Sequence, residues 1–266
     1  MQTSLQAIAN KAARDKRYRF SNLYRMLNVE NTIDSWRLLN KRAATGVDQI
    51  SAQEFGENLQ ENVETLIAQV RGNRYRAKLV RRQYIPKANG KLRPLGIPAT
   101  ADKLLQKVVT RILDAIYKQD FLPSSYGYRP NIGPQDAVRD LSRELQFGPY
   151  NFLVEADIRG YFDNLDHSLS MRAVKKHRNV EWILLYIERW LKAPVQQEDG
   201  TLVGRECGMP QGSVISPLIV TFRRGGGKLA QVLSDYLGQR FLDFLFDLIS
   251  FSGTGDCYFK TDLNSW

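Results

Sequence analysis

Cysteine, histidine and long apolar runs are scarce in this sequence of 266 residues. It has 2 cysteines and 2 histidines, and Cys207 and Cys257 form no metal-binding spacing. So few cysteines argue against a disulfide-stapled extracellular scaffold and favour a reducing compartment. The apolar runs are too short and too interrupted to cross a membrane, and residues 1–17 lack the apolar stretch of a secretory signal. The sequence therefore predicts a cytoplasmic protein with no membrane association.

Positive charge, by contrast, is in excess and concentrated. The formal net charge is +10 and the pI is about 9.6, which favours a polyanionic partner. Nine cations and no acid occupy residues 71–93: Arg71, Arg74, Arg76, Lys78, Arg81, Arg82, Lys87, Lys91 and Arg93. Tyr75 and Tyr84 are interleaved with these cations, and such rings stack on unpaired bases. We expect this segment to contact nucleic acid or nucleotide phosphates rather than to form a merely solvated surface.

The periodicity of apolar residues predicts both helices and strands. Helical spacing occurs at 52–70, at 102–119, from Pro134 onward and at 180–191. Residues 78–85 and 91–97 alternate around Ala88-Asn89-Gly90, which is typical of a hairpin, and 195–206 predicts another that turns at Asp199-Gly200. With 43% hydrophobic residues, the chain can bury a core in two subdomains. The pattern predicts an α/β or α+β arrangement.

One carboxylate follows a short apolar strand. Residues 152–154 are apolar, and Asp157 comes after them with no basic residue before Arg159. A carboxylate at the end of an apolar strand must be solvated, and a divalent cation is the strongest candidate, although helix or strand capping is the ordinary role of a lone acid. Because Mg²⁺ also accepts main-chain oxygen, the backbone carbonyl of Ile158 is a second predicted ligand.

A second segment, GMPQGSVISP at 208–217, combines a rigid Pro210, the amide of Gln211 and a permissive Gly212. Such a loop suits a sugar or a base edge. Together with VEADIRGYFDNLDH at 154–167, it resembles the palm and nucleotide-binding segments of reverse transcriptases, most closely the group II intron-encoded type. YRFSNLYRML, NKRAATGVDQIS, QYIPKANGKLRPLGIP and LPSSYGYRP extend the resemblance over roughly residues 18–220.

The resemblance implies an α+β right-hand polymerase fold. Residues 1–150 would form the N-terminal extension and fingers, and 151–220 a partial palm with the first catalytic carboxylate. Residues 221–266 would be a divergent tail, so the chain would be truncated within the palm with the thumb absent.

The same resemblance implies roles for individual residues. Asp157 would be catalytic and would bind Mg²⁺ together with the Ile158 carbonyl. The incoming dNTP would be bound by Lys87 and Arg93 on opposite limbs of a fingers hairpin, by Arg81, by Tyr161 under the ribose and by Gln211. Contacts to nucleic acid are expected from Arg71, Arg74, Arg76, Lys78, Arg82, Tyr128 and Arg129.

One catalytic element of that family is not matched. An aromatic–Ala–Asp–Asp turn should follow Pro217 by several dozen residues, yet no Asp-Asp dipeptide occurs in the 266 residues. The inherited function would be Mg²⁺-dependent RNA-directed DNA synthesis, with group II intron RNA, primer–template and dNTP as partners. We expect this chain to be inactive as a polymerase. Two alternatives remain: a non-catalytic, maturase-like RNA-binding fragment, and a retron-type or CRISPR-associated reverse transcriptase.

Overall fold

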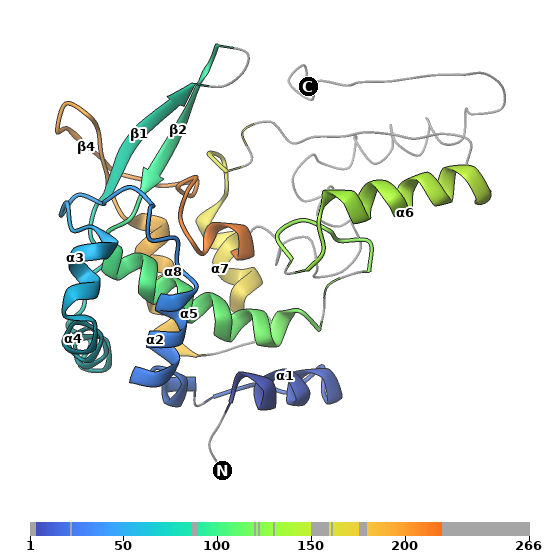
Figure 1. The fold of residues 1–266 in the computed structure, drawn as a ribbon, viewed down its shortest axis with the longest axis horizontal. Helices are drawn as coiled ribbons and strands as arrows, with labels where there is room; N and C mark the ends of the chain where they lie inside the picture. Colours follow the sequence, from blue (N-terminus) through green and yellow to red (C-terminus); the bar gives the residue numbers. More distant parts are fainter. Residues whose placement is uncertain are drawn as a thin grey trace. The chain divides into compact units, whose positions relative to one another are not determined.

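The computed structural model describes residues 4–21, 23–86, 90–119, 121, 123–129, 131–149, 160, 162–175 and 180–219 (Figure 1). The chain divides into two units, one made of residues 1–120 and 162–219 and the other of residues 121–161 and 220–266. Helices and a small mixed sheet give the α+β class that the resemblance implies. In the described ranges, no helix is long and apolar enough to cross a membrane.

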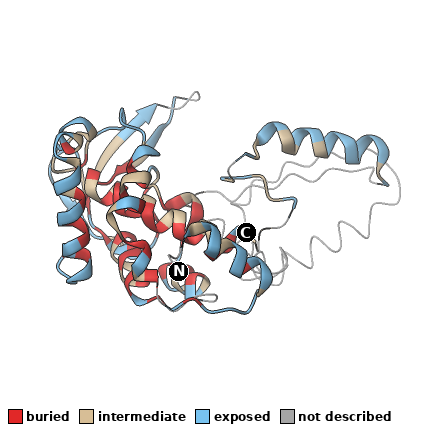
Figure 2. Ribbon diagram, turned by 60° about the horizontal axis from the view of Figure 1, so that its bottom comes forward, coloured by how far each residue is buried: buried red, intermediate tan, exposed pale blue. Residues whose placement is uncertain are grey.

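Most helices belong to the first unit, and α5 lies at its centre. They are α1 (Leu5–Arg14), the 3-10 helix η1 (Leu23–Met26), α2 (Val29–Arg37), α3 (Ala52–Glu57), α4 (Leu59–Arg71), α5 (Thr100–Tyr117), α7 (His167–Lys175) and α8 (Glu181–Lys192). Both α1 and α2 pack on α5, whose Leu104, Val108 and Ile112 are fully buried. Figure 2 shows the buried residues gathered on the helices of this unit. The apolar stripe predicted for 102–119 is therefore core.

The helix predicted over 52–70 is in fact two helices. Ser51 and Glu54 form a capping box that starts α3. Asn58 then leaves helical geometry, with φ −118° and ψ 44°, and α4 starts after it. Gly56 and Asn58 both have weak helix propensity, which explains why a continuous apolar stripe does not keep the helix intact.

Four strands form one sheet in the order β2-β1-β3-β4. The predicted hairpin is confirmed as β1 (Val80–Pro86) and β2 (Leu92–Ile97), which are antiparallel, although residues 87–89 of its turn lie outside the described residues. The second predicted hairpin is also confirmed: β3 (Val195–Gln196) pairs with β4 (Leu202–Val203), and Gly200 takes φ +86° in the turn. Because β3 runs parallel to β1, it joins the second hairpin to the first.

The described part of the second unit contains α6 (Pro134–Phe147), which starts at Pro134 as expected. None of the described residues of α6 is buried, and Val138, Leu141 and Leu145 on its apolar stripe are exposed. The preceding loop is tied to this helix because the Tyr126 hydroxyl donates to Asp140 Oδ2 over 2.7 Å.

Candidate nucleotide and nucleic-acid interface

The hairpin register places two predicted phosphate-binding cations on one face. Arg81 pairs with Ile97 and Ile85 pairs with Arg93, so the side chains of Arg81 and Arg93 share a face of the two strands. Arg93 is exposed near the hairpin end, whereas Arg81 is half-buried at its base. Lys87 lies outside the described residues, so its convergence with Arg93 stays a prediction.

Arg81 has a partner within the protein. Its Nε and Nη2 donate to the carbonyl of Thr45 over 2.9 and 2.7 Å, which ties the loop before α3 to β1. Two donors of this guanidinium are therefore engaged by main chain. The described contacts make Arg81 an anchor for the loop, and its contact with a triphosphate stays a prediction.

The GMPQG loop, residues 208–212, contacts the hairpin directly. Gly96 N donates to Gln211 O over 2.8 Å, so the segment lies along β2. A Cβ at position 96 would lie only 2.6 Å from Pro210 Cβ and 2.7 Å from Val80 Cγ1, which means that only glycine permits this approach. The structure therefore brings half-buried Gln211 next to the basic hairpin, two features that lie more than a hundred residues apart in the sequence.

Helix α5 holds the residues that follow the GMPQG loop. Gln106, a buried amide on α5, accepts from Ser213 Oγ over 2.8 Å and from Val214 N over 2.9 Å. A buried side chain that satisfies two donors fixes the loop position, because breaking either bond would leave a buried polar group without a partner. The role of Gln106 cannot be predicted from the sequence, since a single polar residue on an apolar helix gives no local signal.

The residues that follow the predicted metal site also contact this loop. Met209 N donates to Phe162 O and Gly208 N donates to Leu165 O, each over 2.7 Å. Asp166 caps α7 by accepting from Leu169 N over 2.8 Å. Asp157, Ile158 and Tyr161 lie outside the described residues, and their roles stay predictions. No group of three His, Cys, Asp or Glu in the described ranges could hold a metal ion.

Two half-buried cations, Arg82 and Arg205, interact electrostatically. Arg82 shares its face with Gly96, and Arg205 follows β4. Burial, with the charge of Arg82 as a further cause, lowers the pKa of Arg205 to about 10. Arg82 Nε and Arg205 Nη1 are buried without a hydrogen-bond partner in the part of the chain that the structure describes. Two cations with unpaired N–H groups favour binding of an anion. Arg205 was not predicted from the sequence because it lies outside the basic segment at 71–93.

The basic segment at 71–78 is not one continuous binding face. Arg71 Nη2 donates to Leu27 O over 2.7 Å, and Lys78 Nζ forms an ion pair with Asp48 over 2.9 Å. The expectation that Tyr75 stacks on bases is wrong, since it is 6% exposed and packs against Tyr186 with ring centroids 5.9 Å apart. The other predicted contacts in this segment, Arg74 and Arg76, are exposed. Tyr84 on β1 is exposed as well.

The loop of the second unit keeps one aromatic ring exposed. Tyr128 is 64% exposed and takes φ +58°, an uncommon conformation for a bulky residue. Arg129 donates to Ser125 O over 2.9 Å and lies 5.7 Å from the Phe121 ring. The loop thus holds Arg129 by local contacts, and binding of nucleic acid by Tyr128 and Arg129 stays a prediction.

Comparison with known proteins identifies the class. Residues 85–248 match the family described as reverse transcriptase (RNA-dependent DNA polymerase). This range includes the end of β1, all of β2, the GMPQG loop and part of the segment after Val220 that the sequence sets apart. The chain therefore belongs to the reverse transcriptase family, whose members are RNA-directed DNA polymerases.

The relatives of the chain include a group II intron-encoded protein. It is 31% identical to protein YkfC of Escherichia coli over 242 residues, which is 88% of this chain and 62% of YkfC. It is 36% identical to the group II intron-encoded protein LtrA of Lactococcus lactis over 191 residues, which is 68% of this chain and 29% of LtrA. Among solved structures, a partial Cas6-RT-Cas1–Cas2 complex is 25% identical with a TM-score of 0.47, covering 74% of this chain and 32% of that one. The chain thus spans less than two thirds of the length of these relatives.

Proposed function

We propose that this chain binds the nucleotide and the RNA in a group II intron-type reverse transcriptase, which adds dNTPs to a primer on an RNA template. The observation that supports it most is the docking of the GMPQG loop on the basic hairpin, through Gly96 N and Gln211 O. This contact puts an amide suited to a sugar or base edge beside the strand that carries Arg93. Binding of a nucleoside triphosphate needs both a polar group for the sugar or base and a cation for the phosphates.

The other predicted site residues would bind the metal ion, the triphosphate and the sugar. Asp157 and the Ile158 carbonyl would hold Mg²⁺, which when bound activates the primer hydroxyl and stabilises the leaving pyrophosphate. Arg93 and Lys87 would neutralise the triphosphate. Tyr161 would lie under the ribose and favour deoxynucleotides. These roles concern binding and positioning, which supply most of the catalysis in phosphoryl transfer.

We also propose that the 266-residue chain binds RNA but does not extend a primer when assayed alone. Two-metal catalysis needs several carboxylates, because one cannot hold two divalent ions against their mutual repulsion. No adjacent pair of aspartates occurs in the sequence to join Asp157. The exposed cations of the hairpin support RNA binding without catalysis. Group II intron RNA is the proposed partner.

Nucleotide binding at the hairpin is tested with Arg93→Gln. We expect this variant to weaken dNTP binding to a preformed complex of the chain with an RNA template and DNA primer, measured by fluorescence with Mg²⁺ present. Arg14→Gln, which removes the same charge from exposed α1, serves as the matched control. Equal dNTP affinity in the two variants would contradict the assignment of Arg93.

A further inference from the structure

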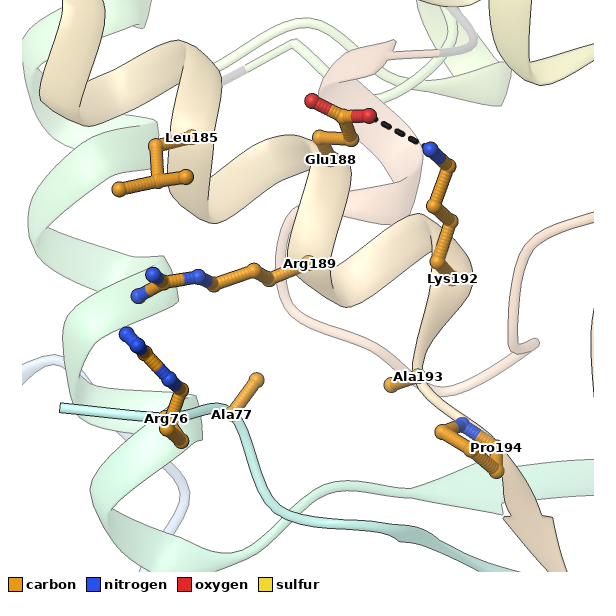
Figure 3. A pocket seen from close by; sticks show the side chains of 8 residues that line it. All are labelled: Arg76, Ala77, Leu185, Glu188, Arg189, Lys192, Ala193 and Pro194. Atoms are coloured by element: carbon orange, nitrogen blue, oxygen red, sulfur yellow. Dashed lines mark hydrogen bonds and ion pairs between the residues drawn. The ribbon is translucent and has the colours of Figure 1, made fainter.

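An open pocket of about 410 Å³ lies between α8 and the segment that leads into β1. Figure 3 shows the side chains that line it. Arg76 comes from the segment before β1, Glu188, Arg189 and Lys192 come from α8, and Pro194 follows that helix. Three cations and one acid therefore meet in one open depression, which suits a single charged group of a long polymer better than an enclosed small molecule.

The two guanidinium groups in this pocket face one another. Figure 3 shows the ends of Arg76 and Arg189 pointing toward each other. Arg189 is held in place because its Nη1 donates to Tyr75 O over 2.8 Å and its Cζ lies 5.1 Å from the centre of the Tyr186 ring. A guanidinium fixed at one edge loses little side-chain entropy when its other N–H groups bind an anion. Like charges that converge in this way favour an anion between them.

Lys192 points toward Glu188 and away from the two guanidinium groups (Figure 3). Its Nζ pairs with Glu188 Oε1 over 2.6 Å, but both side chains are about half exposed or more, at 61% and 46%. An exposed i,i+4 pair of this kind contributes roughly 0–1 kcal/mol, so an incoming anion can replace Glu188 as the partner of Lys192. The hydrogen bond from Lys192 lowers the pKa of Glu188, which keeps this acid charged and repulsive toward anions at neutral pH.

The pocket lies at the base of the basic hairpin. Val80, the first residue of β1, donates its N–H to Pro194 O over 2.9 Å, and it pairs with Val195 of β3. The main chain therefore runs directly from the pocket into the strands that carry Arg81 and Arg93. An RNA strand presents a phosphate at every nucleotide, so RNA along the hairpin can place one of them here.

We propose that Arg76 and Arg189 bind a backbone phosphate of RNA in this pocket, as a contact separate from the nucleotide site, and that Lys192 leaves Glu188 to join them. This inference rests on the proposed function, which supplies the RNA. Glu188 limits the strength of the contact, so removal of its charge strengthens binding. Neither Arg189 nor Lys192 belongs to the basic segment that the sequence singles out, and the fold brings both to Arg76.

The test measures binding of a fluorescein-labelled single-stranded RNA to the full chain over a salt series, without Mg²⁺ or dNTP. We expect Arg76→Gln to weaken binding severalfold and to reduce the slope of log K against log salt concentration by about 0.7, as for one lost contact with single-stranded nucleic acid. Glu188→Gln is expected to strengthen binding. Arg172→Gln on α7 and Glu181→Gln on α8 make the same charge changes at exposed positions outside the pocket.

The proposal would be overturned if each pocket variant changed RNA affinity only as much as its control, because only net charge would then matter. The pairs to compare are Arg76→Gln with Arg172→Gln, and Glu188→Gln with Glu181→Gln. A second titration with free dTTP separates the two sources of phosphate. If Arg76→Gln lowers dTTP affinity and leaves RNA affinity unchanged, the RNA assignment is wrong. Because the RNA titration needs neither metal nor nucleotide, pocket-specific effects together with unchanged dNTP binding in Arg93→Gln would contradict only the nucleotide site.

Discussion

At the scale of single residues, Asp102 is a buried carboxylate that joins three parts of the first unit. Its Oδ2 accepts from Lys78 N over 2.9 Å, and its Oδ1 accepts from Trp190 Nε1 over 3.0 Å. Burial raises its pKa from 3.8 to about 6, while the hydrogen bonds from Lys78 and Trp190 act in the opposite direction. It therefore connects the entry to β1, helix α5 and helix α8, and its ionisation is linked to folding.

Asp102 makes the free energy of unfolding of the protein depend on pH. A carboxyl whose pKa is higher in the folded state stabilises the fold fully below the unfolded pKa, and this contribution is lost as pH rises through about 6. The free energy of unfolding of the wild type, relative to Asp102→Asn, should fall by roughly 2 kcal/mol between about pH 4 and pH 7. Urea unfolding of both proteins across this range measures the difference. A difference that is flat or rises with pH would contradict the account.

The charge of Arg205 destabilises the fold, so its removal should stabilise the protein. Its pKa is lowered by burial and by Arg82, so the charged form is less favourable in the folded than in the unfolded state. We expect Arg205→Gln to raise the melting temperature of the ligand-free chain at low ionic strength. The gain should shrink as salt screens the repulsion. A lower melting temperature at every salt concentration would show that Arg205 is held by an attractive contact.

At the scale of structural elements, the hairpin and the GMPQG loop depend on one close contact. Gly96→Ala would place a Cβ 2.6 Å from Pro210 Cβ and 2.7 Å from Val80 Cγ1. We expect it to destabilise the protein by about 1–3 kcal/mol, as overpacking does, and to weaken dNTP binding by displacing Gln211. Gly204→Ala is the matched control, because no atom lies within 4 Å of its added Cβ. Equal stability of the two variants in urea unfolding would refute the importance of this contact.

The same elements show how far the sequence predicts the structure. Alternation and turn residues predicted both hairpins, because these signals are local. Tyr75 was assigned to the surface since cations flank it, whereas Tyr186, which buries it, lies far along the chain. Arg205, Gln106 and the cations of α8 were missed for the same reason: each gains its role from a residue distant in sequence. The break at Asn58 was missed because the apolar stripe continues through it.

At the scale of the whole molecule, the resemblance predicted the family and the fold class, and both are confirmed. The first unit assembles residues 1–120 with residues 162–219, so the hairpin and the GMPQG loop, which are distant in the sequence, meet through folding. The predicted Mg²⁺ ligands lie outside the described residues, so they are tested by activity measurements on variants.

The most direct measurement is primer extension by the purified 266-residue chain on an RNA template with Mg²⁺ and dNTPs, beside Asp157→Ala. RNA binding is measured on the same preparations. We expect no extension by either protein and equal, salt-sensitive RNA binding by both. Extension by the wild type that disappears in Asp157→Ala would contradict this expectation, because the chain would then supply every carboxylate that polymerisation needs.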